Sequence, residues 1–138
     1  MKLRFLVILL VFFVVGLNAA LNKRLVGSWE LTEFKIVQKG KPTTSDEKKL
    51  KEMGAEWNLE FSEDGSFKQK FNLRNPEKKM EIEEGKWTTV NDSLFIEFKN
   101  DSQTSKLNYT YILLGDVVVL SLENPLTTDK VITRFRRK

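Results

Sequence analysis

Between Leu25 and Arg136 the chain consists of short segments in which apolar and polar residues alternate. In one of them, Trp57, Leu59 and Phe61 alternate with polar residues. Because successive side chains of a β-strand point to opposite faces, this period of two predicts half-buried strands. The pattern recurs in eight segments, which we predict as strands at residues 25–37, 56–61, 66–73, 79–90, 93–99, 106–114, 117–122 and 130–136.

The connections between most of these segments are short and rich in turn-forming residues. Residues 62–65, 91–92 and 115–116 contain Gly, Asn and Asp, which favour tight turns. Strands joined in this way form an antiparallel meander, and closing the meander into a barrel removes its two exposed edges. The sequence therefore predicts an all-β protein, an eight-stranded antiparallel up-and-down barrel.

The first predicted strand changes phase along its length. Trp29 and Leu31 share one face at its start, whereas Phe34 and Ile36 carry the apolar side further on. A single extra residue in one strand produces this kind of shift. We expect a β-bulge, or a crossing of the strand from one face to another, between the two pairs.

Residues 39–54 interrupt the strand pattern with a charged segment. Thr44 and Glu47 have the spacing of a capping box, and Gly54 stands where a helix end favours a positive φ. Leu50 and Met53 form a narrow apolar stripe. The segment predicts one short helix between the first and second predicted strands, lying against the barrel as a lid or plug.

Residues 1–20 have a different composition from the remainder of the chain. Lys2 and Arg4 precede an unbroken apolar run from Phe5 to Val15, and small or turn-forming residues follow it. This order is typical of a secretory signal peptide, and the run is shorter than the roughly 20 apolar residues of a spanning helix. We expect cleavage near Ala20 rather than a membrane anchor. A single mature domain at residues 21–138 is then exported to the periplasm or secreted.

The composition excludes several classes of function. The chain has no Cys and no His, which removes thiolate chemistry, a lipid-anchoring cysteine, and the commonest ligand of transition metals. Without Lys2 and Arg4, the 23 basic residues become 21 against 19 acidic ones, and their signs are interspersed. A nucleic-acid-binding face needs a stronger basic excess. We predict no metal, no cofactor, no nucleic acid and no stable membrane span after signal cleavage.

Acidic residues are plentiful, but their pattern does not predict catalysis. Glu81, Glu83 and Glu84 lie together on one predicted strand beside several lysines. Paired acids that transfer protons must converge in a pocket, and we interpret this cluster as a solvated charged face. No motif for a nucleophilic serine or for phosphate binding is present. We therefore predict that the protein is not an enzyme.

A barrel of eight strands is near the size at which the interior is either filled by side chains or holds one small ligand. Gln69 is the polar exception on the predicted inner face, where it could orient a ligand. The alternative is that the same residues form only the core. The candidate ligand-binding residues are Trp57, Phe61, Phe67, Gln69, Phe71, Trp87, Tyr109 and Tyr111.

The opening Gly27-Ser28-Trp29 resembles the Gly-x-Trp motif of lipocalins and of bacterial lipocalin-like domains. Later features agree in order, at residues 61–67, 85–87 and 91–94, and small secreted lipocalin-like proteins of Bacteroidetes-type bacteria have this layout. The resemblance implies a lipocalin or calycin-like barrel. It also implies that Trp29 packs across the closed end under an arginine from the last strand, Arg134 or Arg136.

The resemblance also implies a function. We expect an exported, non-catalytic binding protein that holds a small apolar or amphipathic ligand in its barrel. The alternative is an extracytoplasmic protein-interaction or inhibitor module with a packed barrel, for which the sequence names no protein partner. An accessible apolar cavity would favour the first expectation, and a filled interior the second.

Overall fold

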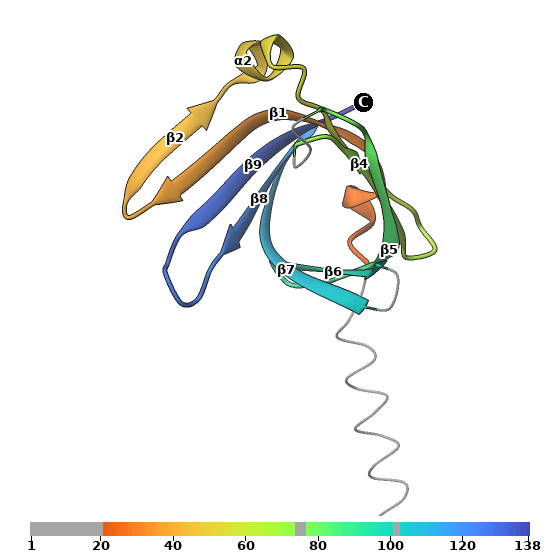
Figure 1. The fold of residues 1–138 in the computed structure, drawn as a ribbon. Coiled ribbons are helices and arrows are strands. Elements are labelled where there is room, and N and C mark those ends of the chain that lie inside the picture. The colour runs from red at the N-terminus through yellow and green to blue at the C-terminus, as the bar shows by residue number, and fades with distance from the viewer. Residues whose placement is uncertain (1–20, 74–76, 101–102) are drawn as a thin grey trace, which may run out of the picture.

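The computed structural model describes residues 21–73, 77–100 and 103–138, which form nine strands and two short helices (Figure 1). The predicted signal peptide at residues 1–20 lies outside the described residues. No helix in the described part of the chain is long and apolar enough to cross a membrane. The elements are η1 (Lys23–Leu25), β1 (Gly27–Gln38), β2 (Lys41–Ser45), α2 (Glu47–Glu52), β3 (Trp57–Phe61), β4 (Ser66–Phe71), β5 (Glu81–Val90), β6 (Ser93–Asn100), β7 (Gln103–Leu114), β8 (Val117–Glu123) and β9 (Lys130–Arg137).

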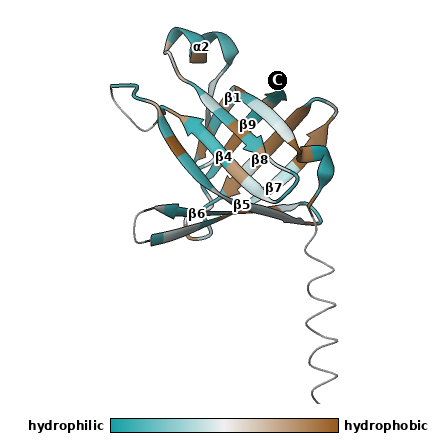
Figure 2. Ribbon diagram, turned by 90° about the vertical axis from the view of Figure 1, so that its right-hand side faces the viewer, coloured by the Kyte–Doolittle hydropathy of each residue, from teal (hydrophilic) through white to brown (hydrophobic). Residues whose placement is uncertain are grey.

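The strands form a closed antiparallel barrel. Their order is β2-β1-β3-β4-β5-β6-β7-β8-β9, and β9 pairs back onto β1. Eight strands therefore complete the ring, while β2 lies outside it as an extension of the sheet. The predicted eight-stranded antiparallel barrel with one short helix is confirmed. Figure 2 shows the hydrophobic colour concentrated around β8, whose side chains alternate between the core and a half-buried outer face.

Strand β1 has two halves with different neighbours. Its first half pairs with β3 and its second half with β2, while β9 follows both halves on the other side. The register with β9 shifts between Leu31 and Glu33, which confirms the expected bulge. The bulge turns Phe34 toward the barrel interior, and beyond it the β1–β2 hairpin extends past the barrel wall (Figure 1).

The segment 39–54 contains a strand that the sequence analysis did not predict. Thr44 pairs with Lys35 in the β1–β2 ladder and caps no helix. The N-cap of α2 is Asp46, whose side chain accepts a 2.9 Å hydrogen bond from the backbone N–H of Lys49. The capping box at Thr44 is therefore wrong, because pairing with β1 holds that residue extended.

The remaining features predicted for this helix are confirmed in part. Gly54 follows the helix with φ of +67°, as its position predicts. Leu50 is buried, whereas Met53 is 47% exposed. The apolar stripe of α2 therefore consists of Leu50 alone, which is the one buried apolar side chain of this short helix.

One end of the barrel is closed around Trp29. Helix η1 lies over this end, and its residue Leu25 is fully buried together with Trp29. The indole N–H of Trp29 donates a 2.8 Å hydrogen bond to the carbonyl of Leu25. Gly27 has φ of +132°, and a Cβ there would lie 2.8 Å from Nη1 of Arg137. This positive φ, which residues with a side chain rarely adopt, explains the glycine of the Gly-x-Trp pattern.

The arginine over Trp29 is Arg137, and the expectation of Arg134 or Arg136 is wrong. The guanidinium of Arg137 lies 4.3 Å from the centre of the Trp29 ring. It also donates hydrogen bonds of 2.8 Å to the carbonyl of Val26 and 2.7 Å to that of Arg24. Strand alternation explains the correction, because Arg134 and Arg136 share the outer face of β9 while Arg137 lies on its inner face.

Candidate functional site

The barrel contains an apolar cavity of about 440 Å³ away from the Trp29 end. This volume falls within the roughly 300–1,000 Å³ of typical small-molecule sites. Its apolar and aromatic lining comes from seven strands and from Leu73, which follows β4, and is formed by Phe34, Trp57, Phe71, Leu73, Phe98, Leu107, Tyr109, Leu122 and Val131. Four further side chains add polar groups, namely Gln69, Glu83, Ser105 and Thr133.

Four of the eight candidate ligand-binding residues lie on this cavity. They are Trp57, Gln69, Phe71 and Tyr109, and they come from β3, β4 and β7. Lining residues absent from the candidates include Phe34 and Phe98, which lie on the inner face of β1 and β6. The alternation of apolar and polar residues in their strands already indicated that both side chains point inward.

The other four candidates pack in the core and do not line the cavity. The ring of Phe61 lies 5.1 Å from those of both Phe67 and Trp87. The hydroxyl of Tyr111 donates to the carbonyl of Asn91 and accepts from Nδ2 of Asn22. Alternation identified them correctly as inward residues, but it contains no information on their height along the barrel axis.

Gln69 is held in a fixed orientation by Trp57. The indole N–H donates a 2.9 Å hydrogen bond to Oε1 of the Gln69 amide. Because indole only donates, this contact assigns the amide oxygen to the Trp57 side and the amide nitrogen to the other. Gln69 is 8% exposed, and within the described residues no hydrogen bond uses its amide nitrogen. Two donors of a buried side chain thus remain available at the cavity.

Tyr109 is a second buried polar group on the cavity wall. It is 7% exposed, and its hydroxyl forms no hydrogen bond with another described residue. Burial, and to a smaller extent the negative charge of Glu83, raise the pKa of Tyr109 to about 12. The phenol is therefore neutral at physiological pH and can donate or accept a hydrogen bond.

Glu83 is a lining residue that the sequence analysis assigned to a solvated face. It pairs with Gln69 across β4 and β5, so it shares the inner face with that side chain. Glu84 points outward, and its carboxylate lies 4.0 Å from Nζ of Lys68. The solvated-face interpretation is therefore wrong for Glu83, although it holds for Glu84.

A parity argument could have found Glu83. Trp87 is buried, and counting back by twos from it along β5 reaches Glu83. The apolar residues Met80 and Ile82 suggested the opposite phase, but they are 43% and 57% exposed. The large apolar residue Trp87 is buried, and the residues of β5 that share its face therefore point inward.

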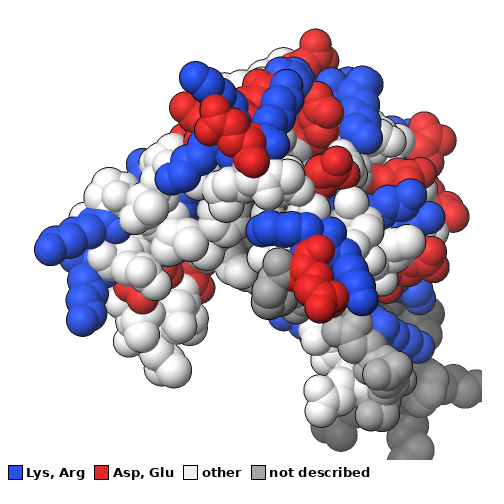
Figure 3. Space-filling model, turned by 45° about the horizontal axis from the view of Figure 1, so that its top comes forward, with Lys and Arg blue, Asp and Glu red and all other residues white. Residues whose placement is uncertain are grey.

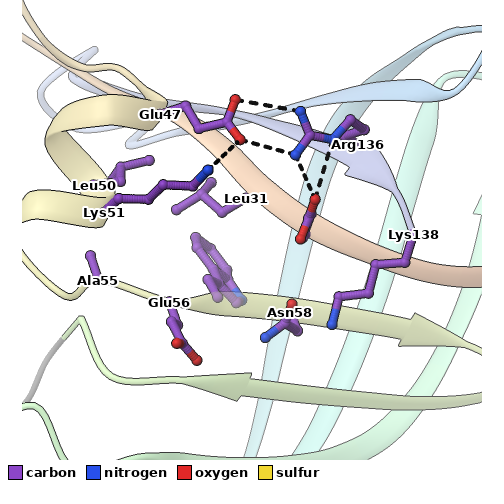
Figure 4. A pocket seen from close by; sticks show the side chains of 11 residues that line it. Leu31, Glu47, Leu50, Lys51, Ala55, Glu56, Asn58, Arg136 and Lys138 are labelled. Atoms are coloured by element: carbon purple, nitrogen blue, oxygen red, sulfur yellow. Dashed lines mark hydrogen bonds and ion pairs between the residues drawn. The ribbon is translucent and has the colours of Figure 1, made fainter.

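A second hollow, a polar groove of about 300 Å³, lies beneath α2 on the outside of the barrel (Figure 4). Arg136 on β9 faces Glu47 on α2 and Glu30 on β1, with distances of 2.9 Å and 2.6 Å from its Nη2. The hydrogen bond from Arg136 lowers the pKa of Glu47 below its usual range. Trp57 borders both this groove and the cavity, so its ring forms the wall between them.

The charged side chains near this groove are mixed in sign. Figure 3 shows basic and acidic residues interspersed over the face that comes forward from the top of Figure 1. Among the residues that the structure describes, no group of three or more acidic side chains is arranged to hold a metal ion. In this groove, the ion pairs of Arg136 with Glu30 and Glu47 connect α2 to the barrel wall.

A closed up-and-down barrel of eight strands, plugged at one end and hollow beyond, is the architecture in which lipocalins enclose small molecules. The lipocalin-like domain family matches residues 25–116, and the chain belongs to this family. The expected family resemblance is thereby confirmed.

Solved structures support the same fold. A lipocalin-like protein from Bacteroides uniformis is 18% identical with a TM-score of 0.53, over 83% of this chain and 98% of that one. An uncharacterized protein from Bacteroides eggerthii is also 18% identical, with a TM-score of 0.51 over 82% of this chain and 98% of that one. No curated protein matches the chain.

Proposed function

We propose that this protein binds a small apolar or amphipathic molecule in the barrel cavity and does not transform it. One observation carries the proposal, namely that Gln69 and Tyr109 present unused hydrogen-bonding groups to an otherwise apolar space. A ligand that pairs with both groups replaces solvent at these atoms while it buries its apolar surface in the cavity.

The cavity also distinguishes this proposal from a packed barrel that acts only through its surface. Half of the aromatic and polar candidates pack in the core without lining the cavity, whereas Tyr109 belongs to the core and also lines the open space. Filling the remaining space would have required only larger side chains at positions such as Leu107 and Val131. The open space favours ligand binding over the interaction module.

Export is the second part of the proposal. It rests on the basic, apolar and small-residue order of residues 1–20, which is typical of a signal peptide and supports a location in the periplasm or outside the cell. Mass spectrometry of the protein purified from its own host tests this directly. A mature N-terminus close to Leu21 in the cell envelope or medium is the expected result, and an intact Met1 in the cytoplasm contradicts export.

Binding is tested with N-phenyl-1-naphthylamine, an uncharged probe whose fluorescence rises in apolar surroundings. We expect saturable binding that Leu107→Trp abolishes, because the larger ring fills the cavity. Leu114→Trp is the matched control, since Leu114 lies on the same strand but is 57% exposed on the outside. Circular dichroism verifies that both variants fold. Absence of saturable binding, or equal loss in both variants, contradicts the proposed function.

A further inference from the structure

The amide of Gln69 has one defined orientation at the cavity. Trp57 pairs with Phe71 across β3 and β4, so Gln69 is its diagonal neighbour on the same inner face. The indole N–H donates to the amide oxygen at 2.9 Å, and within the described residues no hydrogen bond uses the amide nitrogen. Because indole cannot accept, a flipped amide would set two donors against each other. Gln69 therefore presents donors, and no acceptor, to a ligand.

Trp57 is itself held by contacts on two sides. Its ring packs edge-on against Phe135, with 5.2 Å between the ring centres, and it also borders the groove beneath α2. Rotation of the indole would break this packing together with the hydrogen bond to Gln69. Trp57 thus acts as a positioning residue that keeps the Gln69 nitrogen directed away from itself.

The hydroxyl of Tyr109 is the adaptable polar group of the cavity. It forms no hydrogen bond with another described residue, and burial is the main cause that raises the pKa of Tyr109 to about 12. A neutral phenol donates or accepts, as its partner requires. Neither this oxygen nor the Gln69 nitrogen is among the unpaired atoms sealed from solvent in the described part of the chain. A molecule in the cavity can therefore reach both.

The other polar side chains of the lining leave Gln69 as the group of fixed direction. Thr133 is 1% exposed, and its hydroxyl donates to the carbonyl of Leu120 at 3.4 Å. Glu83 has an interaction of its own, and Ser105 is exposed. The direction in which a ligand can hydrogen-bond is therefore set by the amide of Gln69.

We infer that the cavity selects ligands with a hydrogen-bond acceptor, such as a ketone oxygen, over ligands of the same shape whose polar group only donates. The inference rests on the proposed function and names its ligand class. The ligand oxygen accepts from the amide N–H of Gln69, Tyr109 adapts to either kind of group, and the hydrocarbon contacts the aromatic walls. A ligand N–H in the same place would face another N–H and leave a donor without an acceptor, which lowers affinity.

The test compares 9-fluorenone, carbazole and fluorene at neutral pH, each as a competitor that displaces N-phenyl-1-naphthylamine. The three share one flat tricyclic skeleton, and the central ring carries an acceptor carbonyl, a donor N–H or a methylene group. Each affinity is divided by the compound's partition coefficient between cyclohexane and water, which removes differences in hydration. We expect the corrected affinity of fluorenone to exceed that of carbazole by about fivefold or more. A corrected ratio of about two or less overturns the inference.

Two variants test whether the orientation of the amide causes the preference. Trp57→Phe keeps a ring in the wall but releases the amide, which can then turn its oxygen to the ligand, so the fluorenone-to-carbazole ratio should fall toward one. Trp87→Phe is the matched control, because its buried indole N–H donates to the Ser62 carbonyl at 3.0 Å and Trp87 does not line the cavity. A general loosening of the barrel would weaken all three compounds and leave their ratio intact. An unchanged ratio in Trp57→Phe, or an equal fall in Trp87→Phe, overturns the inference.

The side-chain amide protons of Gln69 give a direct readout in an NMR spectrum, where their signals are assigned by their loss in Gln69→Leu. Fluorenone should move them to lower field than fluorene does, because only the ketone accepts from them. The same position with both compounds overturns the inference. Failure of the proposed function is distinguishable, because then neither the probe nor any of the three compounds binds.

Discussion

The indole N–H of Trp57 on β3 donates a 2.9 Å hydrogen bond to Oε1 of Gln69 on β4, and this contact sets the orientation of the Gln69 amide at the cavity. It engages the amide oxygen and leaves the amide N–H groups able to donate to another acceptor. The ring of Trp57 also packs edge-on against Phe135 at 5.2 Å and separates the cavity from the groove beneath α2. One side chain thus orients the polar group of the cavity and forms part of its wall.

A double-mutant cycle measures the Trp57–Gln69 contact. Trp57→Phe keeps an aromatic ring but removes the donor, and Gln69→Leu removes the acceptor. We expect the two changes in unfolding free energy, measured in urea, to be non-additive by about 1 kcal/mol, because each single variant leaves a buried polar group unpaired. Additivity within about 0.4 kcal/mol would show that the contact contributes nothing to stability.

The two arginines of β9 provide a matched pair of variants at the closed end. Arg137→Ala removes the stacking on Trp29 and the hydrogen bonds to two carbonyls, so we expect a loss of about 2 kcal/mol in unfolding free energy. Arg134→Ala removes only an exposed pair with Glu33 at 3.9 Å and should cost less than about 0.5 kcal/mol. Equal losses in the two variants would contradict the assignment of Arg137 as the residue that covers Trp29.

The raised pKa of Tyr109 predicts how the unfolding free energy depends on pH in the alkaline range. Its folded pKa of about 12 lies above its ordinary value of 10.0. Between these values the unfolded chain has lost the phenolic proton while the folded protein keeps it, so stability falls as pH rises. Between pH 9 and pH 11.5 the wild type should lose about 1–2 kcal/mol more than Tyr109→Phe in urea unfolding. Other alkaline groups titrate in both proteins, and equal losses would contradict the burial effect.

Much of the barrel could be predicted because the alternation of apolar and polar residues along a strand indicates which of its side chains face the core. The phase shift between Leu31 and Phe34 predicted the bulge of β1, and turn residues placed most strand ends. Strand β2 could not be predicted in the same way, because Lys41–Ser45 is polar on both faces. Its pairing depends on the second half of β1, a partner beyond the barrel that local sequence does not identify.

The site was only half predictable for a related reason. Alternation distinguishes inside from outside, so it found Gln69 and Tyr109, but it could not separate them from Phe61 at the closed end. Glu83 was missed because charge was taken as evidence of solvent exposure. In a hollow barrel, an inward-facing carboxylate reaches a cavity instead of a packed core, so the usual link between charge and surface fails.

The attachment of α2 to the barrel leads to a further prediction. Glu47 on α2 is held by Arg136, and that hydrogen bond is the main cause that lowers the pKa of Glu47 below its ordinary value of 4.5. An NMR titration of the side-chain carboxyl carbons should therefore give Glu47 a midpoint below 4.5 in the wild type. In Arg136→Gln the midpoint should move back toward the ordinary value, because the remaining partner, Lys51, acts more weakly.

The same variant tests whether the ion pair holds the helix in place. The amide of Leu50 lies within α2 and donates to the carbonyl of Asp46, so its hydrogen exchange reports opening of this short element. We expect faster exchange at Leu50 in Arg136→Gln, with exchange at core positions such as Leu120 unchanged, because the lost contact is local. Arg134→Gln, which lies on the same outer face of β9 but contacts Glu33, is the control and should leave α2 unaffected. Unchanged exchange at Leu50 in Arg136→Gln would mean that burial of the Leu50 side chain, rather than the ion pair, keeps α2 on the barrel.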